Sequence, residues 1–173
     1  MKYTYLFFIG LIFFSCRSGQ VKTSDKNKIP QCVDLTFDIE DGTLSGIKPV
    51  QKQSEISEWF PCHTRMVPDG NSSDCGGALY YENHGFTFYT YLYEYLEIRK
   101  DFKGNVTHDL FSKNREEIRQ LLGKPAENDL AAENPDMDFF PMEFGCMRIK
   151  YEGGKPVLIA SHYLACDEIE WCR

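Results

Sequence analysis

The longest strand-like alternation of hydrophobic and polar positions lies between residues 78 and 102, which is also the tract densest in aromatic side chains. Side chains of a strand point to alternate faces, so the even positions are expected to pack on a core. They are Phe86, Phe88, Leu92, Leu96, Ile98 and Phe102. The odd positions, expected to face outward, are Thr87, Tyr89, Tyr91, Tyr93, Tyr95, Glu97 and Arg99. The tract predicts strands over residues 78–82, 86–91 and 95–102.

The residues before this tract predict one strand and one short helix. Apolar residues alternate over residues 32–39, which indicates a half-buried strand. Ile56, Trp59 and Phe60 follow the i, i+3, i+4 spacing of a helix over residues 54–60. Ser54 is its expected N-cap, and Pro61 ends it.

The same order of elements returns after residue 112. Asn114 and Glu117 form a capping box ahead of Ile118, Leu121 and Leu122, and Gly123 ends the helix. A polar loop is expected over residues 126–138, followed by strands at 139–144, 146–151 and 157–163. An offset of 62 places Ile56 on Ile118. The sequence thus indicates two helix-plus-strands repeats, 31–104 and 112–173; chance similarity of amphipathic segments is the alternative.

These elements predict a single α+β domain over residues 31–173, with two short helices on one face of an antiparallel sheet. Each half alone is too small to close a core. The net charge of -7 and the lack of any basic run argue against a nucleic-acid partner.

The first fifteen residues have the features of an export signal. Lys2 supplies a charged start, and residues 6–14 form an apolar run of nine residues, too short to span a bilayer. Ser15 followed by Cys16 resembles the bacterial lipoprotein signal in its looser, Bacteroidetes-type form. The resemblance implies a signal peptide at 1–15, lipidation of Cys16, a tether over 16–30 and attachment to the outer membrane of the cell envelope. Ordinary secretion and an uncleaved anchor are the alternatives.

The cysteines beyond Cys16 indicate a disulfide-braced domain. They are Cys32, Cys62, Cys75, Cys146, Cys166 and Cys172. An even number after an export signal is typical of disulfides in an oxidising compartment, and fifteen connectivities are possible for six cysteines. Local spacing favours Cys62 with Cys75 and Cys166 with Cys172, which leaves Cys32 with Cys146. Metal binding is the alternative, but C-x-x-C and paired histidines are missing.

Candidate catalytic chemistry is sparse. The four histidines, His63, His84, His108 and His162, do not lie at metal-ligand spacing or beside a nucleophile motif. Glu133, Asp136 and Asp138 lack the spacing of a calcium loop. We therefore expect no catalytic residue, no metal and no cofactor.

The second half, with the segments EEIRQLLGKP and MEFGCMRIKYEGGKPVLI, resembles the small outer-membrane assembly lipoprotein domain of the SmpA/OmlA type. Two such units in tandem resemble the architecture of the β-lactamase inhibitor protein. The resemblance implies a non-enzymatic module that has helices on one face of an antiparallel sheet and leaves the other face free to meet a protein.

The expected function is accordingly that of a cell-envelope lipoprotein that binds a protein partner through an aromatic sheet face. Exposed aromatic patches mark interaction sites, and tyrosine is enriched among binding hot spots. The expected contact residues are Tyr89, Tyr91, Tyr93, Tyr95, Glu97 and Arg99. The alternatives are that the tyrosines only pack within the fold, that the chain is an envelope hydrolase or a small-ligand-binding enzyme, or that it inhibits a toxin.

Overall fold

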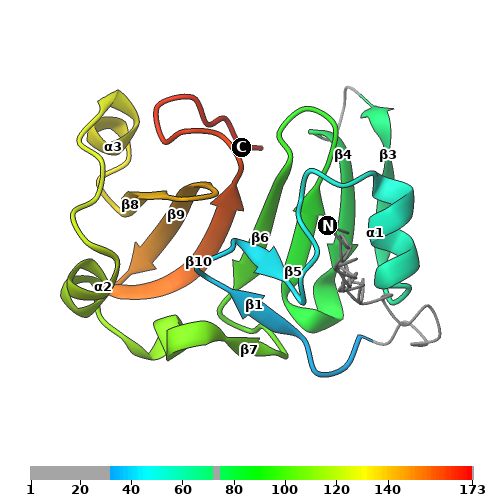
Figure 1. Ribbon diagram of the computed structural model, residues 1–173, viewed down its shortest axis with the longest axis horizontal. Coiled ribbons are helices and arrows are strands. Elements are labelled where there is room, and N and C mark those ends of the chain that lie inside the picture. The colour runs from blue at the N-terminus through cyan, green and yellow to red at the C-terminus, as the bar shows by residue number, and fades with distance from the viewer. Residues whose placement is uncertain (1–31, 72–74, 173) are drawn as a thin grey trace, which may run out of the picture.

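A seven-stranded antiparallel sheet runs through the computed structural model, which describes residues 32–71 and 75–172 (Figure 1). Its strands are β3 (Arg65–Asn71), β4 (Gly76–Tyr81), β5 (Phe86–Tyr89), β6 (Tyr95–Arg99), β8 (Met137–Met142), β9 (Gly145–Glu152) and β10 (Lys155–His162). The strand order is β3-β4-β5-β6-β10-β9-β8. Two meanders, one from each half of the chain, therefore meet where β6 pairs with β10.

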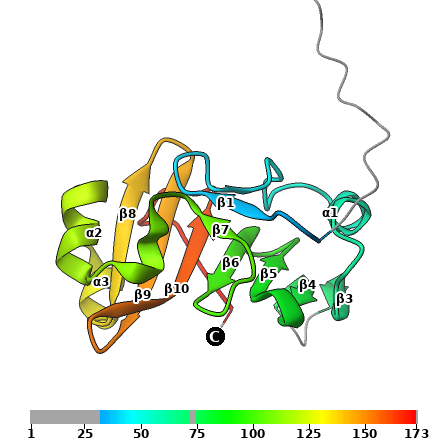
Figure 2. The same ribbon diagram turned by 90° about the horizontal axis from the view of Figure 1, so that it is seen from below.

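A three-stranded sheet of order β2-β1-β7 lies over this large sheet (Figure 2). It consists of β1 (Thr36–Asp38), β2 (Thr43–Leu44) and β7 (Asn105–Val106). The helices are α1 (Gln53–Trp59), α2 (Arg115–Leu122) and α3 (Asp129–Glu133), with 3-10 segments η1 (Glu82–His84) and η2 (Thr107–Ser112). Among the described residues, none of these helices is long and apolar enough to span a bilayer.

The main core lies between one face of the large sheet and a layer made of α1, α2, η2 and the small sheet. Ile56 of α1 and Ile118 of α2 are both fully buried in this one cluster. The sheet supplies the other side with Leu79, Tyr81, Phe86, Phe88, Leu96, Ile98, Phe140, Met147, Ile149, Tyr151 and Ile159. The predicted disulfide-braced α+β fold, with two helices on one face of an antiparallel sheet, is confirmed.

The opposite face of the sheet has a smaller core of its own, contrary to the expectation that it is free. Phe139 and Cys146 of β8 and β9 pack there with Cys166 and Ile169. Leu130 of α3 packs against the same cluster. In Figure 2 the C-terminus lies on the side of the sheet away from β1. The part of this face formed by β8 and β9 is thus covered by α3 and by the chain after β10.

The predicted capping box begins α2 as expected. The Asn114 side chain accepts hydrogen bonds from the backbone N–H groups of Glu116 and Glu117, both at 3.0 Å. The Glu117 carboxylate accepts one from the Asn114 N–H at 2.6 Å. These bonds satisfy backbone donors that a helix start otherwise leaves unpaired.

An acidic residue of β8 anchors α2 to the sheet. Asp138, only 3% exposed, accepts from Arg115 at 2.7 Å and from Arg119 at 2.8 Å. Arg115 and Arg119 are four residues apart, so both reach the strand from one side of the helix. The sequence predicted Asp138 in a polar loop. The carboxylate can instead be buried because two arginines neutralise its charge and satisfy its oxygen atoms.

Three local predictions were wrong. The segment between Cys62 and Cys75, where no strand was predicted, contains β3, which tolerates Pro68 and a register shift between Val67 and Asn71 because it is an edge strand. The predicted loop over 126–138 contains α3, whose N-cap Asn128 accepts from the Ala131 N–H. Helix α1 starts after Lys52, without a side-chain cap, so Ser54 lies inside the helix.

The expected cysteine pairs were also wrong, although all six cysteines of the described residues are in disulfides. The structure joins Cys32 to Cys62, Cys75 to Cys172 and Cys146 to Cys166, with Cα–Cα distances of 6.1, 5.4 and 5.0 Å. Sequence proximity misled because β3 extends between Cys62 and Cys75 and holds them apart in the sheet. Two of the three bridges instead fasten the residues that follow β10 to the sheet.

We expect Asp138→Asn to lower the free energy of unfolding by about 1–3 kcal/mol at pH 7, because two arginines lose their carboxylate. Burial opposes the charged form, but the hydrogen bonds and charges of Arg115 and Arg119 outweigh it and lower the pKa of Asp138. The stabilisation is present above the unfolded pKa and is lost as the pH falls through the lower folded value. Urea unfolding should therefore show a smaller difference at about pH 2.5 than at pH 7.

Asp136→Asn is the matched control, because this carboxylate is 50% exposed and lies 3.9 Å from Lys150. It should cost less than about 0.5 kcal/mol. An Asp138→Asn variant no less stable than this control, or equally destabilised at both pH values, would show that the bridge does not anchor α2.

Candidate functional site

A row of ring and guanidinium groups crosses the sheet face opposite the main core, which we call the aromatic face. The members of this aromatic row are Arg65, Tyr80, Tyr89, Tyr95 and His162, from β3, β4, β5, β6 and β10. The Arg65 guanidinium lies 3.6 Å from the centroid of the Tyr80 ring. Ring centroids are 6.1 Å apart for Tyr80 and Tyr89, 4.3 Å for Tyr89 and Tyr95, and 4.6 Å for Tyr95 and His162.

Strand register places these side chains together. Tyr89 pairs with Tyr95 across β5 and β6, and Tyr95 pairs with His162 across β6 and β10. Directly opposed residues of antiparallel strands lie close enough for rings to stack. The row therefore crosses the junction between the two meanders, and each half of the chain supplies part of it.

Exposure divides the row into an open end and a covered end. Arg65 is exposed and Tyr80 and Tyr89 are half-buried, whereas Tyr95 is 0% and His162 1% exposed. Burial, assisted by the charge of Glu97 and by Tyr80, raises the pKa of Tyr89 to about 12. The Tyr89 hydroxyl consequently stays protonated at physiological pH and can donate a hydrogen bond.

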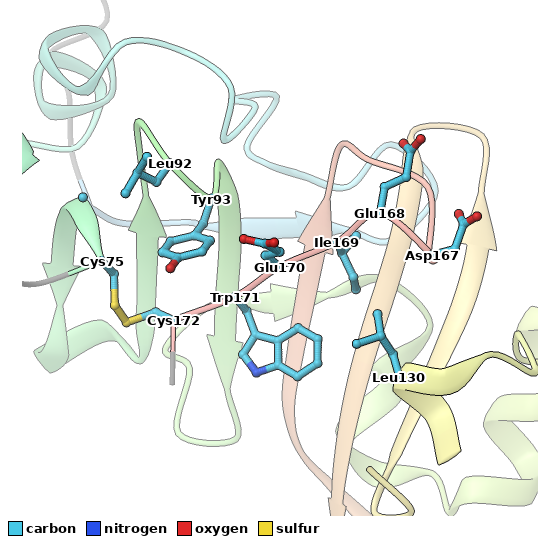
Figure 3. Close-up of a pocket in the computed structure, with 11 residues that line it drawn as sticks. Cys75, Leu92, Tyr93, Leu130, Asp167, Glu168, Ile169, Glu170, Trp171 and Cys172 are labelled. Atoms are coloured by element: carbon cyan, nitrogen blue, oxygen red, sulfur yellow. A yellow bond between two sulfur atoms is a disulfide. The ribbon is translucent and has the colours of Figure 1, made fainter. Parts of the chain in front are cut away.

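The covered end lies beneath residues 163–172, which we call the C-terminal segment. Figure 3 shows its later part, from Asp167 to Cys172, running across the strands toward Cys75. The Cys172 N–H donates to the Tyr95 hydroxyl at 3.3 Å. The disulfides of Cys166 and Cys172 tie the segment to β9 and to the start of β4.

A buried polar cluster lies under this segment. Arg148, 3% exposed, donates to Nε2 of His162 at 3.3 Å, and its Nη2 is 3.8 Å from a carboxylate oxygen of Glu97. Burial and then the charge of Arg148 hold the pKa of His162 well below its usual value, so the imidazole is neutral and can accept this bond. Burial raises the pKa of Glu97 against the opposing charges of Arg148, Arg99 and Lys150.

The ring of Trp171 covers Arg148 on the same side. The guanidinium lies 4.8 Å from the Trp171 ring, and Phe139 packs 5.8 Å from it. A neutral histidine, a buried arginine and a tryptophan thus close the covered end. The cluster is positioned to hold the C-terminal segment on the sheet rather than to meet a substrate.

The structure brings together only part of the predicted contact set. Tyr89, Glu97 and Arg99 lie on the aromatic face, and Arg99 donates to the Thr87 hydroxyl at 3.3 Å. Tyr91 and Tyr93 lie instead in the turn between β5 and β6, where Tyr91 has a positive φ of 71°.

Three positions in this tract differ in burial from the prediction. Tyr95 is fully buried because the C-terminal segment covers it, so the expectation that it faces outward was wrong. Thr87, expected to face solvent, is 1% exposed. Leu92, expected in the core, is 61% exposed because the chain turns before reaching it.

The sequence did not identify Arg65, Tyr80 and His162 as members of this face. Arg65 lies between Cys62 and Cys75, where no strand was predicted, and His162 comes from the other half of the chain. Only the strand order brings them next to Tyr89 and Tyr95.

Among residues 32–71 and 75–172, one group of side chains has metal-ligand proximity. Donor atoms of Cys32, Cys62 and His84 all lie within 4.8 Å of one another. The two sulfurs are joined in a disulfide, however, and a thiolate is what binds a metal. This group in its oxidised form therefore gives no basis for a metal site.

Comparison of the chain with protein-family models, with curated proteins and with solved structures found no match. The resemblances drawn from the sequence thus remain expectations.

Proposed function

We propose that this domain is a protein-binding module of the cell envelope that contacts its partner with the open end of the aromatic row. The observation that carries the proposal is the pair of half-buried tyrosines, Tyr80 and Tyr89, held between the exposed Arg65 and the buried Tyr95. Tyrosine offers a large apolar surface and a hydroxyl, which suits it to an interface.

Rigidity supports a binding role for this surface. Tyr89 stacks on Tyr95, and Tyr95 is locked beneath the C-terminal segment. A side chain that is already ordered loses little conformational entropy when a partner binds. The neighbouring Glu97 and Arg99 supply charges of both signs, which would orient the partner as polar rim residues do.

The hydrolase alternative receives less support. It needs a histidine and a carboxylate that a substrate can reach, and His162 is 1% exposed. The cavity beside the C-terminal segment and the groove between α2 and α3 are both lined without His84 or His162. A toxin-directed inhibitor, in contrast, would be one form of the protein binding proposed here.

The proposed location rests on the N-terminal sequence. Cys16 and the tether lie outside the described residues, and the described domain begins at Cys32, which is fixed to Cys62. A lipid on Cys16 would hold the domain near an outer-membrane leaflet, where its partner would also be found.

Cys16→Ser should abolish membrane attachment, because the lipid is proposed to be carried on that sulfur. The measurement is detergent partitioning of the chain expressed in a bacterium with lipoprotein processing, together with the intact mass of the purified protein. We expect the parent in the detergent phase and the variant in the aqueous phase. Equal partitioning, or a parent mass without added acyl groups, would contradict lipidation.

Tyr80→Ala combined with Tyr89→Ala should weaken partner capture by roughly tenfold or more, because interface tyrosines often contribute about 1–2 kcal/mol each. Crosslinking on native membranes and quantitative mass spectrometry would compare the variant with the parent. Trp59→Ala is the control, since Trp59 is 45% exposed on α1 and lies on the other side of the sheet.

Near-ultraviolet circular dichroism must first show that the double variant is folded. A protein enriched by the parent and by Trp59→Ala but lost from the double variant supports the proposal. A crosslinked protein recovered equally by all three would place the interface elsewhere.

A further inference from the structure

A cavity of about 670 Å³ opens beside the C-terminal segment, and none of the residues of the aromatic row lines it. Its walls come from the start of β4, the turn between β5 and β6, α3 and the C-terminal segment (Figure 3). This volume lies within the range of known ligand pockets. The residues that line the cavity differ in chemistry from the tyrosines proposed as the partner interface.

The walls are fixed in place. The disulfide between Cys75 and Cys172 closes one side. Leu92 rests directly on Gly76, where an added Cβ would lie only 2.6 Å from the leucine Cγ. Arg148 and Phe139 hold the ring of Trp171. The cavity is thus formed before any ligand arrives.

Part of the lining is apolar and accessible. Leu92 is 61% exposed, and Tyr93, Leu130 and Trp171 are half-buried. An exposed leucine beside two aromatic rings is a surface that gains free energy when an apolar chain covers it.

The charged side chains in the described part of the lining are all acidic. Asp167, Glu168 and Glu170 line the cavity, and among the described residues no lysine, arginine or histidine does. None of the three carboxylates forms an ion pair with another residue in the described part of the chain. In Figure 3 the Glu170 carboxylate points toward the Tyr93 ring.

From this combination we infer that the cavity binds a basic, partly apolar peptide segment of a protein partner. Lysine and arginine carry an apolar stem and a cationic head, so the stem can lie along Leu92 while the head meets Glu170. The ring of Tyr93 adds attraction for a cation held near its face. A basic segment also complements the net charge of -7 of the chain. This surface is additional to the proposed tyrosine interface.

Fluorescence of Trp171 provides the test, because the chain has only two tryptophans. In a Trp59→Phe background, Trp171 is the sole indole. The full domain is titrated with the acetylated, amidated peptide Leu-Lys-Leu-Arg-Leu and, separately, with Leu-Glu-Leu-Glu-Leu. We expect a saturable change with the basic peptide, weakened by added salt, and none with the acidic peptide.

A triple variant, Asp167→Asn with Glu168→Gln and Glu170→Gln, should bind the basic peptide at least fivefold more weakly. The matched control neutralises three carboxylates outside the cavity, by Glu55→Gln, Glu58→Gln and Glu152→Gln, and should bind like the parent. Leu92→Ser tests the apolar wall separately and should also weaken binding.

Three results would overturn the inference. The first is that the basic peptide gives no saturable signal. The second is that the cavity triple variant and its control weaken binding equally. The third is that the cavity variants leave binding unchanged. The Tyr80→Ala and Tyr89→Ala double variant should bind the peptide normally, so failure of the tyrosine interface and failure of this site give different results.

Discussion

The pairing of β6 with β10 is the contact on which the rest of the structure depends. Residues 95–99 align with residues 158–162 in antiparallel register, and through them two meanders become one sheet. Neither meander could bury its apolar face alone. Once joined, they present one continuous surface to α1, α2 and the small sheet, and Ile98 and Ile159 meet at its centre.

The pairing of β6 with β10 also determines which side chains lie together on the aromatic face. It places Tyr95 of the first half against His162 of the second, which extends the row of tyrosines toward Arg148. A buried arginine is costly to desolvate unless a partner compensates it. Glu97, His162 and Trp171 supply part of that compensation, although Nη2 of Arg148 has no hydrogen-bond partner among the described residues, and the C-terminal segment brings the tryptophan. The C-terminal segment buries Tyr95 and leaves Tyr80 and Tyr89 half-buried beside it.

Local signals predicted local structure well. The capping box at Asn114 and the helical spacing of Ile118 depend on neighbours in sequence, and α2 begins and packs as they indicate. The alternation of Phe86, Phe88, Leu96 and Ile98 likewise placed all four in the core. In each case the information lies within about ten residues, which is the range over which periodicity can be read.

Other features could not be predicted from the alternation of hydrophobic and polar positions. The 3-10 turn at residues 82–84 reverses the parity of the alternation, so Tyr81 faces the core at an odd position and Phe86 at an even one. Tyr80 therefore joins the aromatic face although it lies at an even position of the tract.

Tyr95 alternates correctly but is covered by a segment that follows it by almost eighty residues. The alternation of hydrophobic and polar positions carries no information about which distant segment covers a side chain. The groups that hold this segment, the disulfides at Cys166 and Cys172, likewise bridge positions that are distant along the chain or across the sheet.

The central claim is that the C-terminal segment is fastened across the aromatic face. Mapping of disulfides by proteolysis without reduction, followed by mass spectrometry, tests it most directly. The structure predicts peptides that link Cys75 to Cys172, Cys146 to Cys166 and Cys32 to Cys62. Peptides that link Cys166 to Cys172, or Cys62 to Cys75, would contradict it, because the segment would then be closed on itself and Tyr95 would be left without its cover.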